Sequence, residues 1–271
     1  MPQPLFFNEI KYIPSFEVAM HRGLWSFVVL FISLTLFNGI KDFFLLFKFP
    51  KKIIILSITA LLIATNWLGF IYSVNIGKVQ DTSLGYFLTP MISISLGYLF
   101  LSEKLNFRKV ISVLLMFFSC LILVFSSDHF PYIAILIGTT WGVYSLLRKQ
   151  IQVPPALGLL FESGLITLFA LPYLVFLGVS ETGFFTYNLN YNSIMLFFTG
   201  IVTIIPLFLF NLGLKYIPLG LAGVLFYIAP SFHFITSVYV LGEYMNNYKF
   251  LAFMIIWIGV SIFIYDAIKK K

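Results

Sequence analysis

Residues 90–106 read PMISISLGYLFLSEKLN, and residues 230–246, 140 positions later, read PSFHFITSVYVLGEYMN. Both segments carry a proline inside an apolar run and a glutamate where the run ends, followed three residues later by an asparagine. The same shift needs no gap and aligns six pairs of identical residues: Pro14 with Pro154, Phe70 with Phe210, Pro90 with Pro230, Leu101 with Leu241, Glu103 with Glu243, and Asn106 with Asn246. We interpret this period as an internal duplication, with one repeat in residues 1–126 and the other in residues 131–271.

The composition of the chain indicates a membrane protein. Hydrophobic residues make up 60% of its 271 residues, charged residues 10%, and the mean hydropathy is +1.00. A soluble domain carries roughly a quarter charged residues. Lipid requires helices or a closed barrel, and the apolar runs lack the alternation of barrel strands. We therefore predict an all-α, polytopic membrane protein.

Intervals without charged residues are long enough to cross the hydrocarbon layer, which takes about 20 apolar residues per helix. They predict nine spans, at residues 23–40, 53–75, 82–101, 110–126, 131–147, 156–178, 193–214, 219–241 and 250–267.

The repeat predicts a tenth helix. The second repeat holds five spans, and the counterpart of its first span, 131–147, falls at about −9 to 7 after the shift of 140. Only its tail, Leu5-Phe6-Phe7, is present, so we expect either a start codon assigned too late or the loss of one helix. Because five is an odd number, the two repeats are expected to insert with opposite orientation. The fold class is thus a bundle of two inverted five-helix repeats, with nine helices complete.

The distribution of basic residues predicts orientation. Thirteen of the 17 Lys and Arg residues fall on one side of the predicted spans and four on the other, which places the first side and the C-terminus in the cytoplasm. These residues stand in short runs between apolar stretches, which argues against a nucleic-acid partner despite the net charge of +7. Cys120 is the single cysteine, so a disulfide or a cysteine-based metal site within one chain is excluded. We expect no cofactor.

Several motifs resemble the RarD branch of the drug/metabolite transporter superfamily, whose repeat is the EamA domain. They are HRGLWS (21–26), NWLGFIYSVN (66–75), SLGYFLTP (83–90), GIVTIIPL (200–207), FYIAP (226–230), LGEYM (241–245) and WIGVSIFIYDAI (257–268). The resemblance covers essentially the whole chain. It implies ten helices in two inverted halves around a central cavity, in the bacterial inner membrane.

Glu17, His21 and Trp25 are spaced four residues apart and share one helix face. These three side chains form a proton-coupled or cation-binding patch near the outer mouth. Alternatively, His21, Arg22 and Trp25 form an interfacial cluster that anchors the helix at the headgroups.

Glu162 lies inside the apolar run GLLFESGLI, and its repeat counterpart is Arg22. An ionisable residue within a span usually faces a cavity or a partner, and the alternative is a carboxylate that snorkels to the interface. Asn66 and Trp67 lie in the middle of another span, where an Asn serves either helix packing or a ligand.

Tyr86 and Tyr227 stand near Pro90 and Pro230, and a proline frees carbonyls that can line a cavity. Aromatic rings there suit planar or cationic substrates, or simply fill space. His233 is expected to be a packing residue.

Glu103 and Glu243 are predicted to cap the following turn or to pair with Lys104 and Lys249. Arg148 and Lys149 are interpreted as topology signals at a cytoplasmic helix end.

These features predict a secondary transporter that moves a small organic molecule by alternating access, with proton coupling as one option. The substrate-binding candidates are Glu162, His21, Arg22, Trp25, Asn66, Trp67, Tyr86 and Tyr227. No ATP-binding glycine loop, HExxH motif or nucleophile elbow is present, so we do not expect an enzyme. The alternatives are a truncated, non-transporting remnant and an integral membrane enzyme acting on lipids. Membrane lipid is an expected partner, and the oligomeric state stays open.

Overall fold

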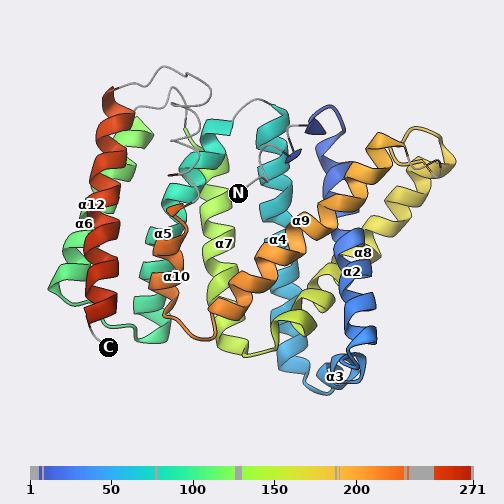
Figure 1. The fold of residues 1–271 in the computed structure, drawn as a ribbon, viewed down its shortest axis with the longest axis horizontal. Helices are drawn as coiled ribbons and strands as arrows, with labels where there is room; N and C mark the ends of the chain where they lie inside the picture. The colour runs from blue at the N-terminus through green and yellow to red at the C-terminus, as the bar shows by residue number, and fades with distance from the viewer. Residues whose placement is uncertain are drawn as a thin grey trace. The chain divides into compact units, whose positions relative to one another are not determined.

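The computed structural model describes residues 6–7, 9–76, 79–125, 130–186, 188, 190–228, 231 and 247–269. These residues form ten α-helices, one 3-10 turn and no strand, as the predicted fold class requires (Figure 1). The elements are α2 (Ser15–Leu36), α3 (Ile40–Leu45), η1 (Leu46–Lys48), α4 (Pro50–Asn75), α5 (Val79–Leu101), α6 (Phe107–Phe125), α7 (Tyr132–Ile151), α8 (Pro155–Val179), α9 (Tyr191–Gly213), α10 (Leu219–Leu225) and α12 (Asn247–Lys269).

Within the described residues, seven helices are long and apolar enough to cross a membrane: α2, α4, α5, α6, α8, α9 and α12. The chain is therefore a multi-pass helical membrane protein. The predicted span 131–147 corresponds to α7, a 20-residue helix that is not among these seven. In the predicted span 219–241, the described helix is α10.

One predicted boundary is wrong. The first span was expected to begin at residue 23, after the charged residues, but α2 begins at Ser15. The helix runs through Glu17, His21 and Arg22, all of which are buried. A charge-free interval marks the end of a helix only when the charged side chains face water, and here they face other helices.

The chain divides into two compact units. Unit 1 contains α5, α6, α7 as far as Leu146, α10 and α12. Unit 2 contains α2, α3, η1, α4, the last turn of α7, α8 and α9. Each unit therefore draws helices from both predicted repeats, whose boundaries remain a prediction.

The 140-residue period is visible in the helix boundaries. α2 begins at Ser15 and α8 at Pro155, 140 residues later. The residues before α2 and α8 are both prolines, with φ and ψ of −53° and 132° in the first and −50° and 137° in the second. Equal spacing and equal geometry at these two helix starts reflect equal local structure, as a duplication predicts.

Helices that are counterparts in the two repeats pack against each other, α2 on α8 in unit 2 and α5 on α10 and α6 on α12 in unit 1. The α6–α12 contact pairs positions that the shift of 140 relates. The Ser112 hydroxyl donates to the Gly259 carbonyl (2.5 Å), and the Ser119 hydroxyl donates to the Ala252 carbonyl (2.6 Å). The shift exchanges the two residue pairs, 112–259 and 119–252, although both donors lie on α6. Residue numbers rise along α6 as they fall along α12, so these counterparts are antiparallel, which is the arrangement of an inverted repeat.

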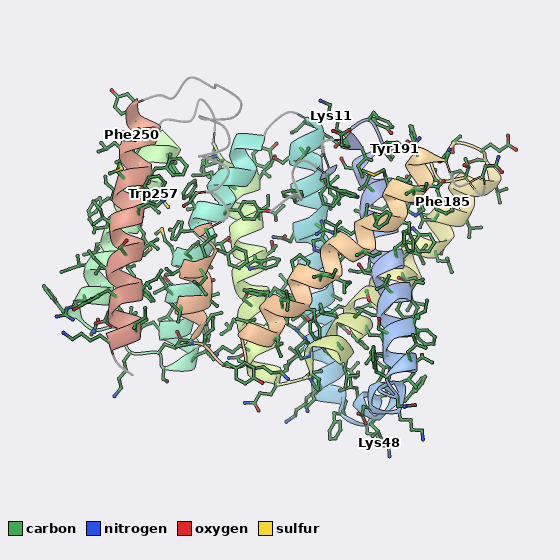
Figure 2. The ribbon with its side chains drawn as sticks, in the orientation of Figure 1. Lys11, Lys48, Phe185, Tyr191, Phe250 and Trp257 are labelled. Atoms are coloured by element: carbon green, nitrogen blue, oxygen red, sulfur yellow. The ribbon has the colours of Figure 1, made fainter. Side chains whose placement is uncertain are left out.

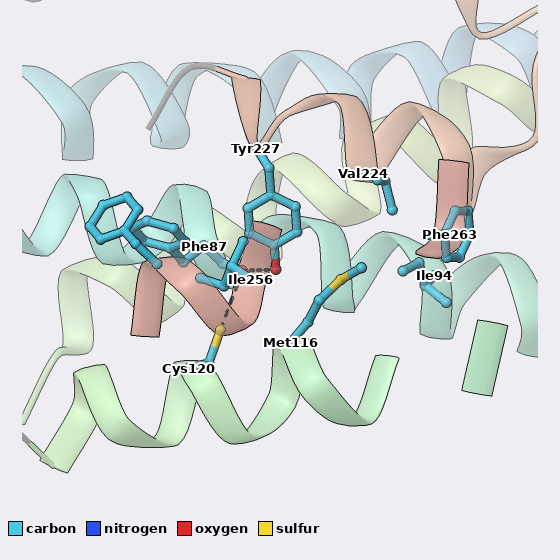
Figure 3. Close-up of a cluster of buried hydrophobic side chains, with 9 residues drawn as sticks. Phe87, Ile94, Met116, Cys120, Val224, Tyr227, Ile256 and Phe263 are labelled. Carbon is cyan, nitrogen blue, oxygen red and sulfur yellow. Dashed lines mark hydrogen bonds between the residues drawn. The ribbon is translucent and has the colours of Figure 1, made fainter. Parts of the chain in front are cut away.

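In the core of unit 1, two residues that are repeat counterparts also contact each other. Tyr227 donates its hydroxyl to the carbonyl of Phe87, its own repeat counterpart (3.0 Å), and their rings lie 5.9 Å apart (Figure 3). Cys120 also donates to this carbonyl (3.5 Å). Pro90 lies inside α5, as predicted, and has no N–H to give to the preceding turn. Two side chains thus hydrogen-bond a backbone carbonyl in the turn before this proline.

The expectation for Glu103 is wrong. Its carboxylate accepts from the backbone N–H groups of Leu219 (2.5 Å) and Gly220 (3.0 Å), so it caps the N-terminus of α10 rather than the following turn or Lys104. Ser102, the residue after α5, has a φ of 55°, and through this left-handed turn the Glu103 N–H donates to the Gly97 carbonyl (3.1 Å) while its carboxylate lies beside Gly97. Glu243, the counterpart, lies outside the described residues.

Candidate functional site

Unit 2 encloses polar and charged side chains within membrane-length helices. α2 packs against α4, α8 and α9, so its residues have neighbours on several sides. The α2 backbone comes close to Gly200 of α9, where an added Cβ would lie 2.6 Å from the carbonyl carbon of Trp25 and 2.7 Å from the nitrogen of Ser26. Only a glycine allows this backbone-to-backbone contact. It brings the polar face of α2 against α9.

Arg22 is buried against α9 and α4. Its Nε donates to the Thr203 hydroxyl (2.6 Å), and its Cζ lies 4.5 Å from the centre of the Trp67 ring and 5.2 Å from that of Phe7. Weakly hydrated guanidinium groups bind well to aromatic faces. The structure therefore brings together two of the predicted site residues, Arg22 and Trp67.

Glu162 is also buried, and it forms an ion pair with Arg148. The Arg148 Nε lies 3.6 Å from the Glu162 Oε1, and each side chain is 2% exposed. Thr59 of α4 donates to the same carboxylate oxygen (2.7 Å), and Arg148 donates to the Asn211 amide oxygen (3.0 Å). A snorkelling carboxylate would be exposed, so that alternative for Glu162 is wrong.

Arg148 is the functional candidate that the sequence reasoning missed. The sequence predicts a topology signal there, but the Arg148 side chain is buried in the last turn of α7 and lies against Gly158 of α8. An added Cβ at Gly158 would collide with the guanidinium. A glycine one turn into α8, four residues before a buried glutamate, was the available signal.

Arg22 and Glu162 occupy equivalent depths. Each lies seven residues after the first residue of its helix, α2 or α8, which is about 10 Å along the axis. Because α2 and α8 are antiparallel counterparts, the two charges lie inward from opposite ends of unit 2. Unit 2 thus holds one polar centre around Arg22 and another around Glu162 and Arg148.

The connection between α8 and α9 covers the N-terminal part of α2. The backbone N–H of Phe184 donates to the Glu17 carboxylate (2.7 Å), and the Tyr12 hydroxyl donates to Asn192 (2.5 Å). Phe185 then lies over α2, with its ring 5.0 Å from that of His21 and 5.8 Å from that of Trp25 (Figure 2). His21 is 3% exposed, and its buried Nδ1 makes no hydrogen bond to any of the described residues.

These contacts bear on the anchor alternative for α2. His21 and Arg22 are buried by protein, so the interfacial-anchor alternative is wrong for them, while the binding role of the patch stays a prediction. Trp25 is half-buried, with its ring against Phe197 of α9 (5.0 Å).

The other predicted residues are divided between the units. Asn66 is buried in unit 2 beside Trp67. Tyr86 is half-buried and Tyr227 fully buried, both in unit 1. His233 lies outside the described residues, as do His129 and Pro230. Substrate binding by the eight candidates stays a prediction. Within the described ranges, no group of three or more His, Cys, Asp and Glu could hold a metal ion.

A model of the EamA-like transporter family matches residues 5–125 and again residues 131–265. The chain belongs to this family. Among its relatives, the "Uncharacterized transporter YojE" of Bacillus subtilis is 34% identical over 99% of this chain and 90% of that protein. "Protein RarD" of Salmonella typhi is 34% identical over 98% of this chain and 90% of that protein. The predicted resemblance is confirmed.

A solved crystal structure shares the EamA-like fold, with a TM-score of 0.69 at 16% sequence identity, covering 99% of this chain and 96% of that one. Similarity at this identity concerns the fold alone. The family and the names of its members indicate a membrane transporter rather than an enzyme.

Proposed function

We propose that this EamA-like protein is a secondary transporter that carries a small organic molecule across the bacterial inner membrane by alternating access, with its C-terminus in the cytoplasm. The observation that supports this most is the Arg148–Glu162 ion pair, buried in unit 2. Placing charges in a membrane segment is costly, and such residues are typical of substrate or proton pathways. Packing alone would be served as well by apolar side chains of similar volume.

In this proposal the Glu162 carboxylate is the coupling group. A proton or an organic cation bound to Glu162 would replace Arg148 as the partner of this carboxylate. The released Arg148 guanidinium would retain its hydrogen bond to Asn211. The pair therefore has a charged state with the ion pair made and a second state with it broken. Alternating access needs such a two-state element.

Counterflow into liposomes that contain the purified protein tests transport. We expect uptake of at least one labelled metabolite or drug-like compound that depends on the same compound inside, and its absence across a broad panel would overturn the proposal. Because Glu162→Gln leaves Arg148 unpaired and is expected to destabilise the fold, the double variant Arg148→Gln, Glu162→Gln is measured too. If the folded double variant transports at the wild-type rate, the pair is not the coupling element.

We further propose that the described part of the α8–α9 connection, residues 181–186, gates access to His21. The Glu17 carboxylate holds it through the Phe184 N–H, a charge-assisted bond. With His21→Cys as a reporter in a Cys120→Ala background, Glu17→Ala is expected to raise labelling by a membrane-impermeant maleimide roughly ten- to a hundred-fold. The matched control is Glu181→Gln, an exposed carboxylate of the same connection. Equal labelling rates in both variants would refute the gate, whatever the outcome of the counterflow assay.

A further inference from the structure

The connection between α2 and α4 differs from the rest of unit 2 in its side chains. Residues 37–52 read FNGIKDFFLLFKFPKK, which includes five phenylalanines, four lysines and one aspartate. Short loops of membrane proteins are usually polar, yet this connection alternates aromatic and basic residues. It forms α3 and η1.

One side of this segment is fixed to the protein. Leu46 is buried in a core cluster with Leu56, Ile151, Val153, Leu157 and Phe161, and Phe43 packs against the same cluster. The Phe47 ring lies 6.0 Å from that of Phe161. The segment is therefore packed into the core of unit 2.

The other side carries both apolar and basic groups. Phe37 is 82% exposed and Phe44 64% exposed, and Phe47 and Phe49 are exposed as well. Lys41, Lys48 and Lys51 are exposed, and the Lys52 ammonium lies 5.0 Å from the centre of the Phe49 ring. In Figure 1, α3 is seen nearly end-on while α2 and α4 run along the plane of the picture, so α3 lies across their ends. Figure 2 shows Lys48 at this end of the unit.

A helix across the ends of membrane spans, with exposed phenylalanines and lysines, fits the boundary between headgroups and acyl chains. In that position the phenylalanines would reach the acyl region and the lysines the phosphates. Four lysines against Asp42 leave three net positive charges, which favour a partner with negative charge.

The repeat supplies an internal comparison. The counterpart of residues 37–52 is 177–192, LGVSETGFFTYNLNYN, the connection between α8 and α9. It keeps paired phenylalanines but has no lysine or arginine and one glutamate. Two connections of common origin thus carry opposite charge, so the lysines are a property of one membrane side rather than of the turn.

From these contacts we propose that residues 37–52 form a binding surface for anionic phospholipid headgroups, here called the lipid foot. Its occupant is a lipid such as phosphatidylglycerol in the leaflet that contacts α3. Each lysine near an anionic surface strengthens binding roughly five-fold. A net charge of three therefore predicts a preference over a zwitterionic lipid of roughly a hundred-fold. The inference holds whatever molecule is carried.

Native mass spectrometry of the full chain in a neutral detergent tests this surface. The protein is given an equimolar mixture of phosphatidylglycerol and phosphatidylcholine with identical acyl chains, and each bound lipid is counted. The wild type is expected to retain at least ~ten-fold more phosphatidylglycerol than phosphatidylcholine. This ratio is expected to fall below about three in the variant Lys41→Gln, Lys48→Gln, Lys51→Gln, Lys52→Gln. The matched control is Lys104→Gln, Lys215→Gln, which removes two exposed lysines of other connections and is expected to keep the preference.

A second variant separates charge from apolar insertion. Phe37→Ser, Phe44→Ser is expected to lower the binding of both lipids while keeping their ratio. A wild type without preference, or a quadruple variant that keeps it, would overturn the lipid foot. Displacement of phosphatidylglycerol by about 10 mM inorganic phosphate would also overturn the lipid foot, because the site would then bind free phosphate. An equal loss of phosphatidylglycerol preference in the control Lys104→Gln, Lys215→Gln would overturn it as well, because the preference would then depend on the net charge of the protein and not on this surface.

Discussion

The buried ion pair makes a quantitative prediction about stability. Arg148 and Glu162 lie 3.6 Å apart, and each side chain is 2% exposed. At an effective dielectric constant of about 20 their attraction is about 4–5 kcal/mol. Removing either partner leaves the other charge buried without its ion pair, which typically costs about 3–5 kcal/mol. Arg148→Gln and Glu162→Gln are therefore each expected to lower the apparent Tm by roughly 6–15 °C.

The double variant is expected to recover most of this loss, because neither buried charge remains. The measurement is the fraction of purified protein that stays monodisperse by size-exclusion chromatography after stepwise heating. Glu181→Gln, which removes an exposed carboxylate, is the control and should shift the Tm by less than about 2 °C. Single variants that match this control, or a double variant whose loss equals the sum of the two single losses, would refute the reasoning.

Two further predictions concern packing. Gly200→Ala is expected to destabilise the protein by about 1–3 kcal/mol, because its Cβ would overlap the α2 backbone. Gly213→Ala in the same helix, where an added Cβ meets nothing within 4 Å, serves as control in the same heating assay and should be neutral. Ser112→Ala and Ser119→Ala remove counterpart hydrogen bonds of the α6–α12 contact and should each cost about 1 kcal/mol. No measurable loss of stability in either variant would contradict the contribution of these hydrogen bonds.

Much of the fold could be predicted because it depends on local composition. Apolar runs of about 20 residues can only be helices in lipid, so long spans were placed within a few residues of the observed helices. The period of 140 predicted antiparallel counterparts, and the α6–α12 hydrogen bonds show them. The prediction failed where charges lie inside a helix, at the start of α2, since counting charges assumes that each one reaches water.

The candidate site was predicted only in part. Glu162 and Arg22 stood out because an ionisable group inside an apolar run is unusual, and both are buried. Their partners could not be predicted, because Arg148 and Thr203 lie on other helices and their approach depends on how those helices pack.

The sequence by itself determined that this chain crosses a membrane many times as helices, that it is built from two related halves, and which residues are costly to bury. These properties follow from the free energy of each segment in lipid and from a fixed spacing, both of which are local. Only the tertiary structure decided that Arg148 neutralises Glu162, that Glu103 caps α10, and that Phe185 covers His21. Such pairings depend on the distance between side chains far apart in the sequence, and helix packing alone sets that distance.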